Sequence, residues 1–390
     1  MTATLKPNLA GLSLEKLKAL FLELGEKPFR AQQISKWIHQ RGVLDIDEMT
    51  DISKSLRERL KQSTEIRLPK LIEEYISTDG CYKWLIEVAS GSRVETVYIP
   101  EAGRGTLCIS SQAGCSLDCS FCATGKQGFN SNLTVAEIVG QLWLANEKLG
   151  GFASSTSRPV TNVVMMGMGE PLLNFDHVMD AVSLMMDDCA YGLSKRKVTI
   201  STSGVVPAID RMKDFTDASL AISLHAPNDA LRSQIMPINK KYPISELMRA
   251  VKGYMASLPD NRVVIIEYTL IAGVNDHRQH ARDLAVLLRE EELPCKINLI
   301  PFNPFSLSDY RRPSGSSVTN FRQILQQAGY TVTVRTTRGE DIGAACGQLV
   351  GDVDDQTRRS SRHKRRAELA AREGKVFDST DNLAASADRL

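Results

Sequence analysis

The sequence contains few aromatic residues, few cysteines and no long apolar run. Aromatic residues make up 6% of the 390 residues, and no set of aromatics interleaved with Lys or Arg marks a standard RNA-recognition module. No segment approaches the roughly 18 uninterrupted apolar residues of a membrane span, and the N-terminal residues lack the pattern of a secretory signal. The 8 cysteines are too few for a disulfide scaffold in a chain of this length. We therefore expect a cytoplasmic protein with no membrane partner.

Charge is nearly balanced over the whole chain but unevenly distributed along it. The formal net charge is +2, yet residues 358–375 carry eight Lys or Arg against two Asp or Glu, so the remaining residues sum to −4. Such a block is typical either of a solvated tail or of an arm that neutralises phosphates. The apolar fraction of 42% and the charged fraction of 24% are those of an ordinary globular protein.

The N-terminal part is predicted to be helical. Apolar residues recur at helical spacing over 13–25, 29–41 and 52–62, which predicts a small helical module. Two strand-like segments follow at 83–89 and 92–99, and Ser90-Gly91 between them is typical of a hairpin turn.

From residue 106 the chain alternates short apolar runs with amphipathic segments of helical length. One predicted helix, 134–149, begins with the capping-box pair Thr134 and Glu137. Six βα units in series indicate a parallel sheet with helices outside, either an open doubly wound sheet or an incomplete barrel, with ligands at the carboxyl ends of the strands. The predicted strands are 106–110, 162–167, 197–202, 219–224, 263–271 and 295–300, followed by a last one at 331–335.

Three cysteines follow the first strand of this α/β body in the pattern C-x3-C-x2-C. Cys115, Cys119 and Cys122 are close enough in sequence to bind one inorganic centre. Zinc normally takes four ligands in two separated pairs, whereas three cysteines on a four-iron cluster leave one iron open for a substrate. The pattern favours the iron-sulfur cluster over zinc and over three unligated thiols.

Several motifs together identify a known family. GCSLDCSFC, GMGEP, SLHAP, IPFNP and AACGQL lie within residues 106–351, and the N-terminal helices and the SRVETVYIP hairpin match as well. The chain resembles the radical-SAM family of dual-specificity methyltransferases that modify carbon 2 of adenine in ribosomal and transfer RNA. The resemblance implies an α/β fold: a partial (βα)6 radical-SAM barrel with a small N-terminal helical domain and a β-hairpin extension. The expected divisions are a helical accessory, RNA-engaging domain at 1–65, a hairpin extension at 66–105, the barrel at 106–351 and a flexible, basic and polar tail at 352–390.

The resemblance also implies the cofactors and their residues. One [4Fe-4S] cluster would be bound by Cys115, Cys119 and Cys122, and its open iron would chelate S-adenosylmethionine. The residues expected to line the S-adenosylmethionine site are Gly169, Glu170, Ser201, Ser223, Leu224, His225 and Asn303.

The implied reaction explains why such cofactors are needed. Carbon 2 of adenine is electron-poor and cannot attack a methyl cation equivalent, so a radical is required. In the family mechanism Cys346 takes a methyl group from one S-adenosylmethionine, and a radical from a second one activates it for addition to the base. Cys108 then resolves the covalent adduct through a transient Cys108–Cys346 disulfide, and Glu95 is the proton acceptor.

The implied substrates are adenosine 2503 of 23S rRNA and adenosine 37 of a subset of tRNAs, and a target base must leave its stack to reach the pocket. We expect a monomer served by a reductase or flavodoxin-type electron donor. RNA binding is expected to be dispersed over basic residues, namely Lys27, Arg30, Lys36, Arg41, Arg335, Arg338 and the tail. Three alternatives remain open: the related carbon-8 methyltransferase, a radical-SAM enzyme acting on a small molecule, and a non-catalytic RNA-binding protein with structural zinc.

Overall fold

The N-terminal helices form a small bundle with its own apolar core. The computed structural model describes residues 6–153 and 158–372. In helix α1, Leu17 and Phe21 lie one turn apart and are fully buried, as the helical periodicity predicts. The three predicted helices are confirmed as α1 (Leu14–Glu23), α2 (Phe29–His39) and α3 (Lys54–Ser63), with short 3-10 turns η1 (Leu9–Gly11) and η2 (Ile46–Glu48) between or before them.

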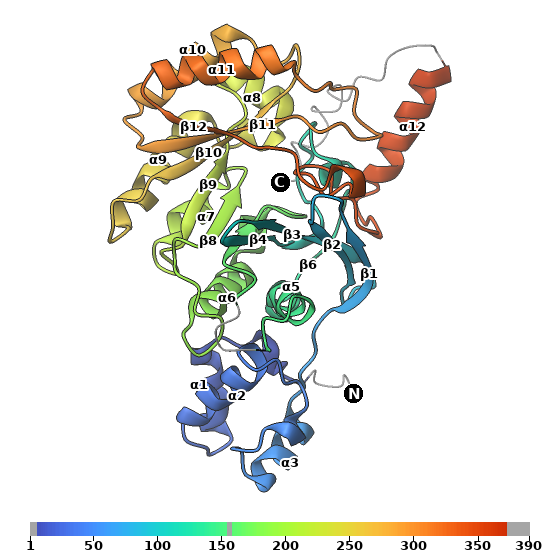
Figure 1. Ribbon diagram of the computed structural model, residues 1–390, viewed down its shortest axis with the longest axis vertical. Helices are drawn as coiled ribbons and strands as arrows, with labels where there is room; N and C mark the ends of the chain where they lie inside the picture. Colours follow the sequence, from blue (N-terminus) through green and yellow to red (C-terminus); the bar gives the residue numbers. More distant parts are fainter. Residues whose placement is uncertain (1–5, 154–157, 373–390) are drawn as a thin grey trace.

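A ten-stranded mixed sheet forms the body of the protein (Figure 1). Its strand order is β1-β2-β3-β4-β7-β8-β9-β10-β11-β12, antiparallel as far as β4 and parallel from β4 onward. The strands are β1 (Lys70–Ile76), β2 (Tyr82–Glu87), β3 (Arg93–Glu101), β4 (Arg104–Cys108), β7 (Asn162–Met165), β8 (Val198–Thr202), β9 (Ser219–Ser223), β10 (Val264–Leu270), β11 (Cys295–Pro301) and β12 (Thr331–Val334).

This strand order decides between the two architectures that the sequence pattern leaves open. A doubly wound sheet reverses its strand order at a switch point, whereas here the parallel strands follow one another in chain order. The sheet is therefore the partial barrel. The hairpin extension differs from the expectation in one respect: strand β1 adds to it, and β3 pairs with β4, so the extension continues the barrel sheet.

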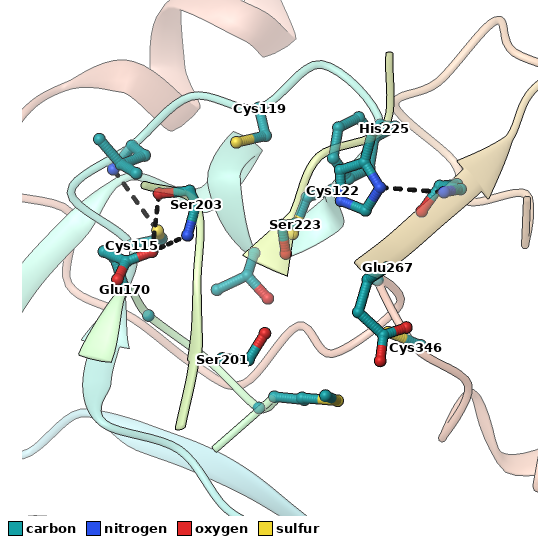
Figure 2. A pocket seen from close by; sticks show the side chains of 18 of the residues that line it. Cys115, Cys119, Cys122, Glu170, Ser201, Ser203, Ser223, His225, Glu267 and Cys346 are labelled. Carbon is teal, nitrogen blue, oxygen red and sulfur yellow. Dashed lines mark hydrogen bonds between the residues drawn. The ribbon is translucent and has the colours of Figure 1, made fainter. Parts of the chain in front are cut away.

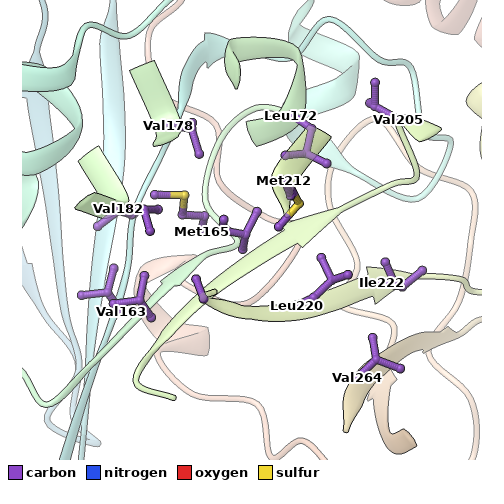
Figure 3. Close-up of a cluster of buried hydrophobic side chains, with 14 of the residues drawn as sticks. Val163, Met165, Leu172, Val178, Val182, Val205, Met212, Leu220, Ile222 and Val264 are labelled. Atoms are coloured by element: carbon purple, nitrogen blue, oxygen red, sulfur yellow. The ribbon is translucent and has the colours of Figure 1, made fainter. Parts of the chain in front are cut away.

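Helices cover the outside of the barrel and enclose its main core. Val163 and Met165 on β7 pack among Val178 and Val182 of α6, as Figure 3 shows. Thr134 and Glu137 form the predicted capping box at the start of α5. The helices of the barrel are α5 (Val135–Lys148), α6 (Phe175–Met186), α7 (Val206–Met212), α8 (Asp229–Ile235), α9 (Ile244–Ser257), α10 (Arg278–Glu290) and α11 (Gly315–Gln327), with 3-10 turns η3 (Pro171–Asn174), η4 (Pro237–Lys240) and η5 (Glu340–Ile342).

Two small elements flank the cysteine motif, and a helix lies beside them. Strands β5 (Gln112–Gly114) and β6 (Phe129–Asn132) form a ribbon that encloses the cysteine loop and helix α4 (Ala123–Gln127). The segment from residue 352, expected to be flexible, instead forms helix α12 (Arg359–Arg372), which packs on α4; residues 373–390 of the predicted tail lie outside the described residues. In the described part of the chain, no helix is both long and apolar enough to span a membrane.

Candidate active site

A pocket lies at the carboxyl ends of the barrel strands, where the sequence predicts a ligand site. Figure 2 shows side chains from the cysteine loop, the strand ends and the Cys346 loop facing into it. Three predicted residues, Leu224, Cys108 and Glu95, are not part of its lining. Those that line it are Cys115, Cys119, Cys122, Gly169, Glu170, Ser201, Ser223, His225, Asn303 and Cys346.

The three motif cysteines share one wall of this pocket. All are free thiols; burial raises the pKa of Cys115 to about 12 and that of Cys119 well above its usual value. Iron binding would convert such thiols to thiolates. Among the described residues, no three His, Cys, Asp or Glu side chains are grouped closely enough to hold one metal ion. A cubane does not require such convergence because each of its irons takes one cysteine, so the donor set fits a [4Fe-4S] cluster.

Arg359 of α12 supports the backbone of the cysteine loop through hydrogen bonds. Its guanidinium donates to the carbonyl oxygens of Cys115 (3.0 Å), Leu117 (2.8 Å), Gly125 (3.1 Å) and Ser116 (3.0 Å). Arg359 is only 9% exposed, so these bonds are shielded from water. The loop backbone is thereby tied to a residue more than 230 positions away in the chain.

A buried carboxylate completes this support. Asp118 lies 3.2 Å from His363 Nε2 and 3.4 Å from Lys126 Nζ. Burial alone would raise the pKa of Asp118, but the hydrogen bond from His363 and the charges of Lys126 and Arg359 lower it to about 2. The C-terminal segment is therefore part of the wall that carries the cysteines.

Glu170 lies at the turn after β7. Gly169 has φ +101°, and a Cβ atom there would lie 2.5 Å from Gln112 Cβ, so only glycine fits. The carboxylate of Glu170 accepts hydrogen bonds from Leu172 N, Thr202 Oγ1 and both the N and Oγ of Ser203. Burial raises the pKa of Glu170 in spite of these donors. Protein groups therefore occupy both of its oxygens.

The ends of β8 and β9 place Ser201, Ser223 and His225 on the pocket. His225 has φ +57°, an uncommon conformation for a non-glycine residue, and its Nδ1 accepts a hydrogen bond from Thr269 N (2.9 Å). Burial lowers the pKa of His225 to about 3, so the ring is neutral and presents Nε2–H.

A second buried arginine supports these strand ends. Arg232, with 0% exposure, donates to the carbonyls of Ser203 (2.5 Å), Ser223 (3.1 Å) and Leu224 (3.1 Å). Leu224 is itself fully buried and contributes its backbone to this arrangement.

Cys346 lies on the wall opposite Cys115, on a loop after η5 (Figure 2). Its carbonyl accepts a hydrogen bond from Asn303 Nδ2 (3.2 Å), and the next residue, Gly347, accepts one from Ala123 N (2.8 Å). The Cys346 residue is exposed because it faces two pockets. Protein nevertheless surrounds the thiol, and burial raises its pKa, an effect that Arg335 opposes.

Cys108 ends strand β4 and is paired in the sheet with Val97 and Val164. Burial raises the pKa of Cys108 to about 12, and the charge of Cys346 adds to the rise while Arg335 opposes it. Both cysteines are free thiols here. The charge of Arg335 therefore acts on both Cys108 and Cys346, the two cysteines that are expected to form a transient disulfide.

Glu95 lies outside the pocket lining, in a buried ion pair. Its Oε1 is 2.9 Å from Lys83 Nζ, and its Oε2 accepts a hydrogen bond from Val350 N (2.9 Å). Glu95 is 6% exposed. The carboxylate therefore holds the chain four residues beyond Cys346.

Sequence reasoning missed Lys83, Arg232 and Arg359, because each meets its partners only through the folded chain. Two expected RNA contacts also have other partners: Arg338 forms an ion pair with Asp79 (2.8 Å), and Arg335 lies against the Cys346 wall.

Comparisons with known proteins agree with this geometry. A family model described as the ribosomal RNA large subunit methyltransferase N-terminal domain matches residues 7–66, and the radical SAM superfamily model matches residues 109–285. A crystal structure of a radical SAM methyltransferase from Sphaerobacter thermophilus superposes with a TM-score of 0.80 at 41% identity, covering 88% of this chain and 99% of the other. The radical SAM match implies S-adenosylmethionine and a [4Fe-4S] cluster as cofactors.

Curated relatives cover almost the entire chain. The dual-specificity RNA methyltransferase RlmN of Marinobacter nauticus is 62% identical over 92% of this chain and 96% of its own length. The protein of the same name from Pseudomonas fluorescens is 58% identical over 98% of both chains. This chain therefore belongs to the RlmN family of radical SAM RNA methyltransferases.

Proposed function

We propose that this protein methylates carbon 2 of adenosine 2503 in 23S rRNA and of adenosine 37 in a subset of tRNAs. The observation that carries the proposal is the shared pocket, which the three motif cysteines and Cys346 line together, with Arg335 close to both Cys346 and Cys108. The dual-specificity RNA methyltransferases to which the chain is similar support the choice of substrate class. These substrates place the reaction in the cytoplasm.

Each wall of the pocket has its own task in this proposal. Cys115, Cys119 and Cys122 would hold the cluster, which together with S-adenosylmethionine would supply a 5′-deoxyadenosyl radical. The proposed S-adenosylmethionine contacts come from the strand ends, and Leu224 acts through its position in the backbone. The members of that set are Gly169, Glu170, Ser201, Ser223, Leu224, His225 and Asn303.

Cys346 carries the methyl group. Its thiolate would attack the methyl carbon of one S-adenosylmethionine, and S-adenosylhomocysteine would leave as the new carbon-sulfur bond forms. A second molecule would be consumed in activating that methyl group, so two are used per turnover. A thiolate is the competent nucleophile, and the Arg335 guanidinium counters the burial that disfavours it. The carbon then joins the base while still bonded to the sulfur of Cys346.

Cys108 and Glu95 release the product. Glu95 accepts the proton from carbon 2, and Lys83, 2.9 Å away, positions its carboxylate. The adduct radical first gives up one electron, which the bound cluster would accept. The Cys108 thiolate then attacks the Cys346 sulfur, so a disulfide forms as the carbon-sulfur bond breaks; the electron pair of that bond stays on the released carbon, which takes up a proton to become the methyl group. A reductase or flavodoxin-type donor returns the disulfide to thiols and supplies the electron for cleavage. The proposed catalyst is a monomer.

Replacing Cys108 by Ala tests the whole scheme. We expect the variant to purify with RNA bonded to Cys346, detectable as a mass increase that ribonuclease trims to a nucleotide. Nucleosides from the wild-type reaction should contain 2-methyladenosine. Accumulation of 8-methyladenosine instead would assign the chain to the related carbon-8 activity, and a colourless protein containing zinc would refute the enzyme.

A further inference from the structure

Two buried carboxylates line the pocket, and only one of them is saturated by protein donors. Glu170 accepts four hydrogen bonds, whereas Glu267, at 2% exposure, uses Oε1 to accept one from Asn298 Nδ2 (2.9 Å). Among residues 6–153 and 158–372, nothing donates a hydrogen bond to Glu267 Oε2. A buried carboxylate oxygen without a donor is costly, so this atom is suited to a donor on a ligand.

Glu267 is held rigidly where the proposed methyl carrier lies. It is paired with Ser223 on β9 and with Asn298 on β11, and its carbonyl accepts from Leu224 N (3.1 Å) and His225 N (3.3 Å). Figure 2 shows its carboxylate beside Cys346, across the pocket from Glu170 and Cys115. The charge of Glu267 acts on the Cys346 thiol, which agrees with this proximity.

We propose that Glu267 Oε2 accepts a hydrogen bond from the exocyclic amino group of the target adenine and thereby selects adenine. The inference rests on the proposed function, since a base attacked through Cys346 must bring carbon 2 to that sulfur. The amino group lies on the same edge of the ring, separated from carbon 2 only by N1 and C6. A residue beside the sulfur can therefore reach it.

The chemistry distinguishes adenine from guanine. Adenine presents an amino donor at this position, whereas guanine presents the O6 acceptor, whose lone pairs a carboxylate repels. A site built to bond a donor also discriminates against an analogue that lacks it, because Glu267 Oε2 then stays buried without a donor.

A double-substitution cycle tests the contact. One RNA hairpin carries the target adenosine, and a second carries purine riboside, which has hydrogen in place of the amino group. With the wild-type protein we expect kcat/KM to fall about 10- to 150-fold on the purine RNA, the range for a hydrogen bond to a charged group. For the near-isosteric E267Q variant, kcat/KM on adenosine RNA should fall by a similar factor relative to the wild-type protein. On purine RNA, E267Q and the wild-type protein should have nearly the same kcat/KM.

Controls separate this contact from other roles of Glu267. E267Q should bind S-adenosylmethionine within twofold of wild type, and the surface variant D210N, which also removes one carboxylate, should behave as wild type on both RNAs. Equal kcat/KM on purine and adenosine RNA in the wild-type protein would overturn the proposal. So would a kcat/KM of E267Q on purine RNA that is reduced by the product of the two single losses. A tenfold loss of S-adenosylmethionine affinity in E267Q would overturn it as well. Absence of 2-methyladenosine from the wild-type reaction would instead refute the proposed function itself.

Discussion

The two cysteine-bearing walls of the pocket are supported in different ways. In the loop with Cys115, Cys119 and Cys122, a buried arginine donates to four carbonyl oxygens, and Asp118 contacts the side chains of Lys126, Arg359 and His363. The loop with Cys346 is held by separate hydrogen bonds from several residues, among them Asn303, Ala123 and Thr124, rather than by one side chain that bonds four of its carbonyls. It also turns through Gly343 and Gly347 in left-handed conformations. Cysteines that share a cluster must keep fixed positions, whereas a thiol that carries a group between partners must be able to move. The difference in support matches that division of tasks.

The largest expected effect comes from removing one thiol from each wall. Cys119→Ala and Cys346→Ala should both abolish RNA methylation, because each removes a required sulfur. Only Cys119→Ala should lose the iron and its brown colour, since Cys346 is not a cluster ligand in our proposal. Iron and sulfide assays after anaerobic reconstitution measure this, and loss of iron from the Cys346 variant would erase the distinction between the walls.

Breaking the ion pair behind the Cys346 wall should be the next largest effect. Lys83→Met leaves Glu95 buried without its partner, which should lower the free energy of unfolding by about 3–5 kcal/mol. Denaturant titration of the apoprotein measures it. The double variant Lys83→Met/Glu95→Gln should recover part of the loss because no buried charge remains unpaired; an equal loss in both variants would show that the charge is not responsible.

Removing the arginine that supports the cysteine loop should lower the free energy of unfolding less than Lys83→Met does, but it should release more iron. Arg359→Ala should accelerate hydrogen exchange of the amides in residues 115–127 and weaken iron retention against a chelator about 10- to 100-fold, as loss of supporting groups around metal ligands does. Arg362→Ala removes the same charge from an exposed position on α12 and is the matched control. If both variants exchange at the same rate, the carbonyl contacts of Arg359 do not hold the loop.

Mild acid should first act on the junction of the N-terminal helices, because the histidine there titrates at higher pH in the unfolded chain than the carboxyl groups do. His39 is 2% exposed and lies 3.2 Å from Tyr191 OH on the barrel, and burial lowers its pKa to about 3. The unfolded chain binds a proton near pH 6.5 while the folded one does not, so stability falls as pH drops from 6.5 towards 3, by about 2 kcal/mol at pH 5. Unfolding of His39→Gln should lack this component; an unchanged pH profile would refute the assignment.

The smallest effect is expected at the turn beside Cys346. Gly347 has φ +83°, and a Cβ atom would approach only Phe121 O, at 3.6 Å. Gly347→Ala should therefore cost about 1 kcal/mol of stability through backbone strain alone. At Gly339, a Cβ atom would lie 2.7 Å from Ala344 Cβ, so Gly339→Ala should cost more. Denaturant midpoints of the two variants show whether backbone strain alone or steric contact of the added Cβ atom determines the loss of stability in this loop.

Much of the site was predictable because its signals are local. The cysteine spacing, the glycine turn before Glu170 and the capping box at Thr134 each act over a few residues, and periodicity located the strands whose ends bear Ser201 and Ser223. Strand β1 was not predicted. The flexibility expected from residue 352 was wrong for α12, because a basic segment is interpreted as solvated when its buried partners are not known. Glu95 is buried in an ion pair because Lys83 lies beside it on the neighbouring strand β2, a contact that the sequence does not show.

The amino-acid sequence by itself determined the ligand types, their spacing and the order of strands and helices, since these follow from covalent neighbours and from the burial of apolar faces. Only the tertiary structure decided which charges meet. Arg359 reaches the carbonyls of the cysteine loop, and Arg232 reaches three strand-end carbonyls. Glu267 keeps one oxygen to which no residue in the described part of the chain donates. Hydrogen bonds and ion pairs act only at short range, so such partners depend on the path of the whole chain and leave no pattern in its sequence.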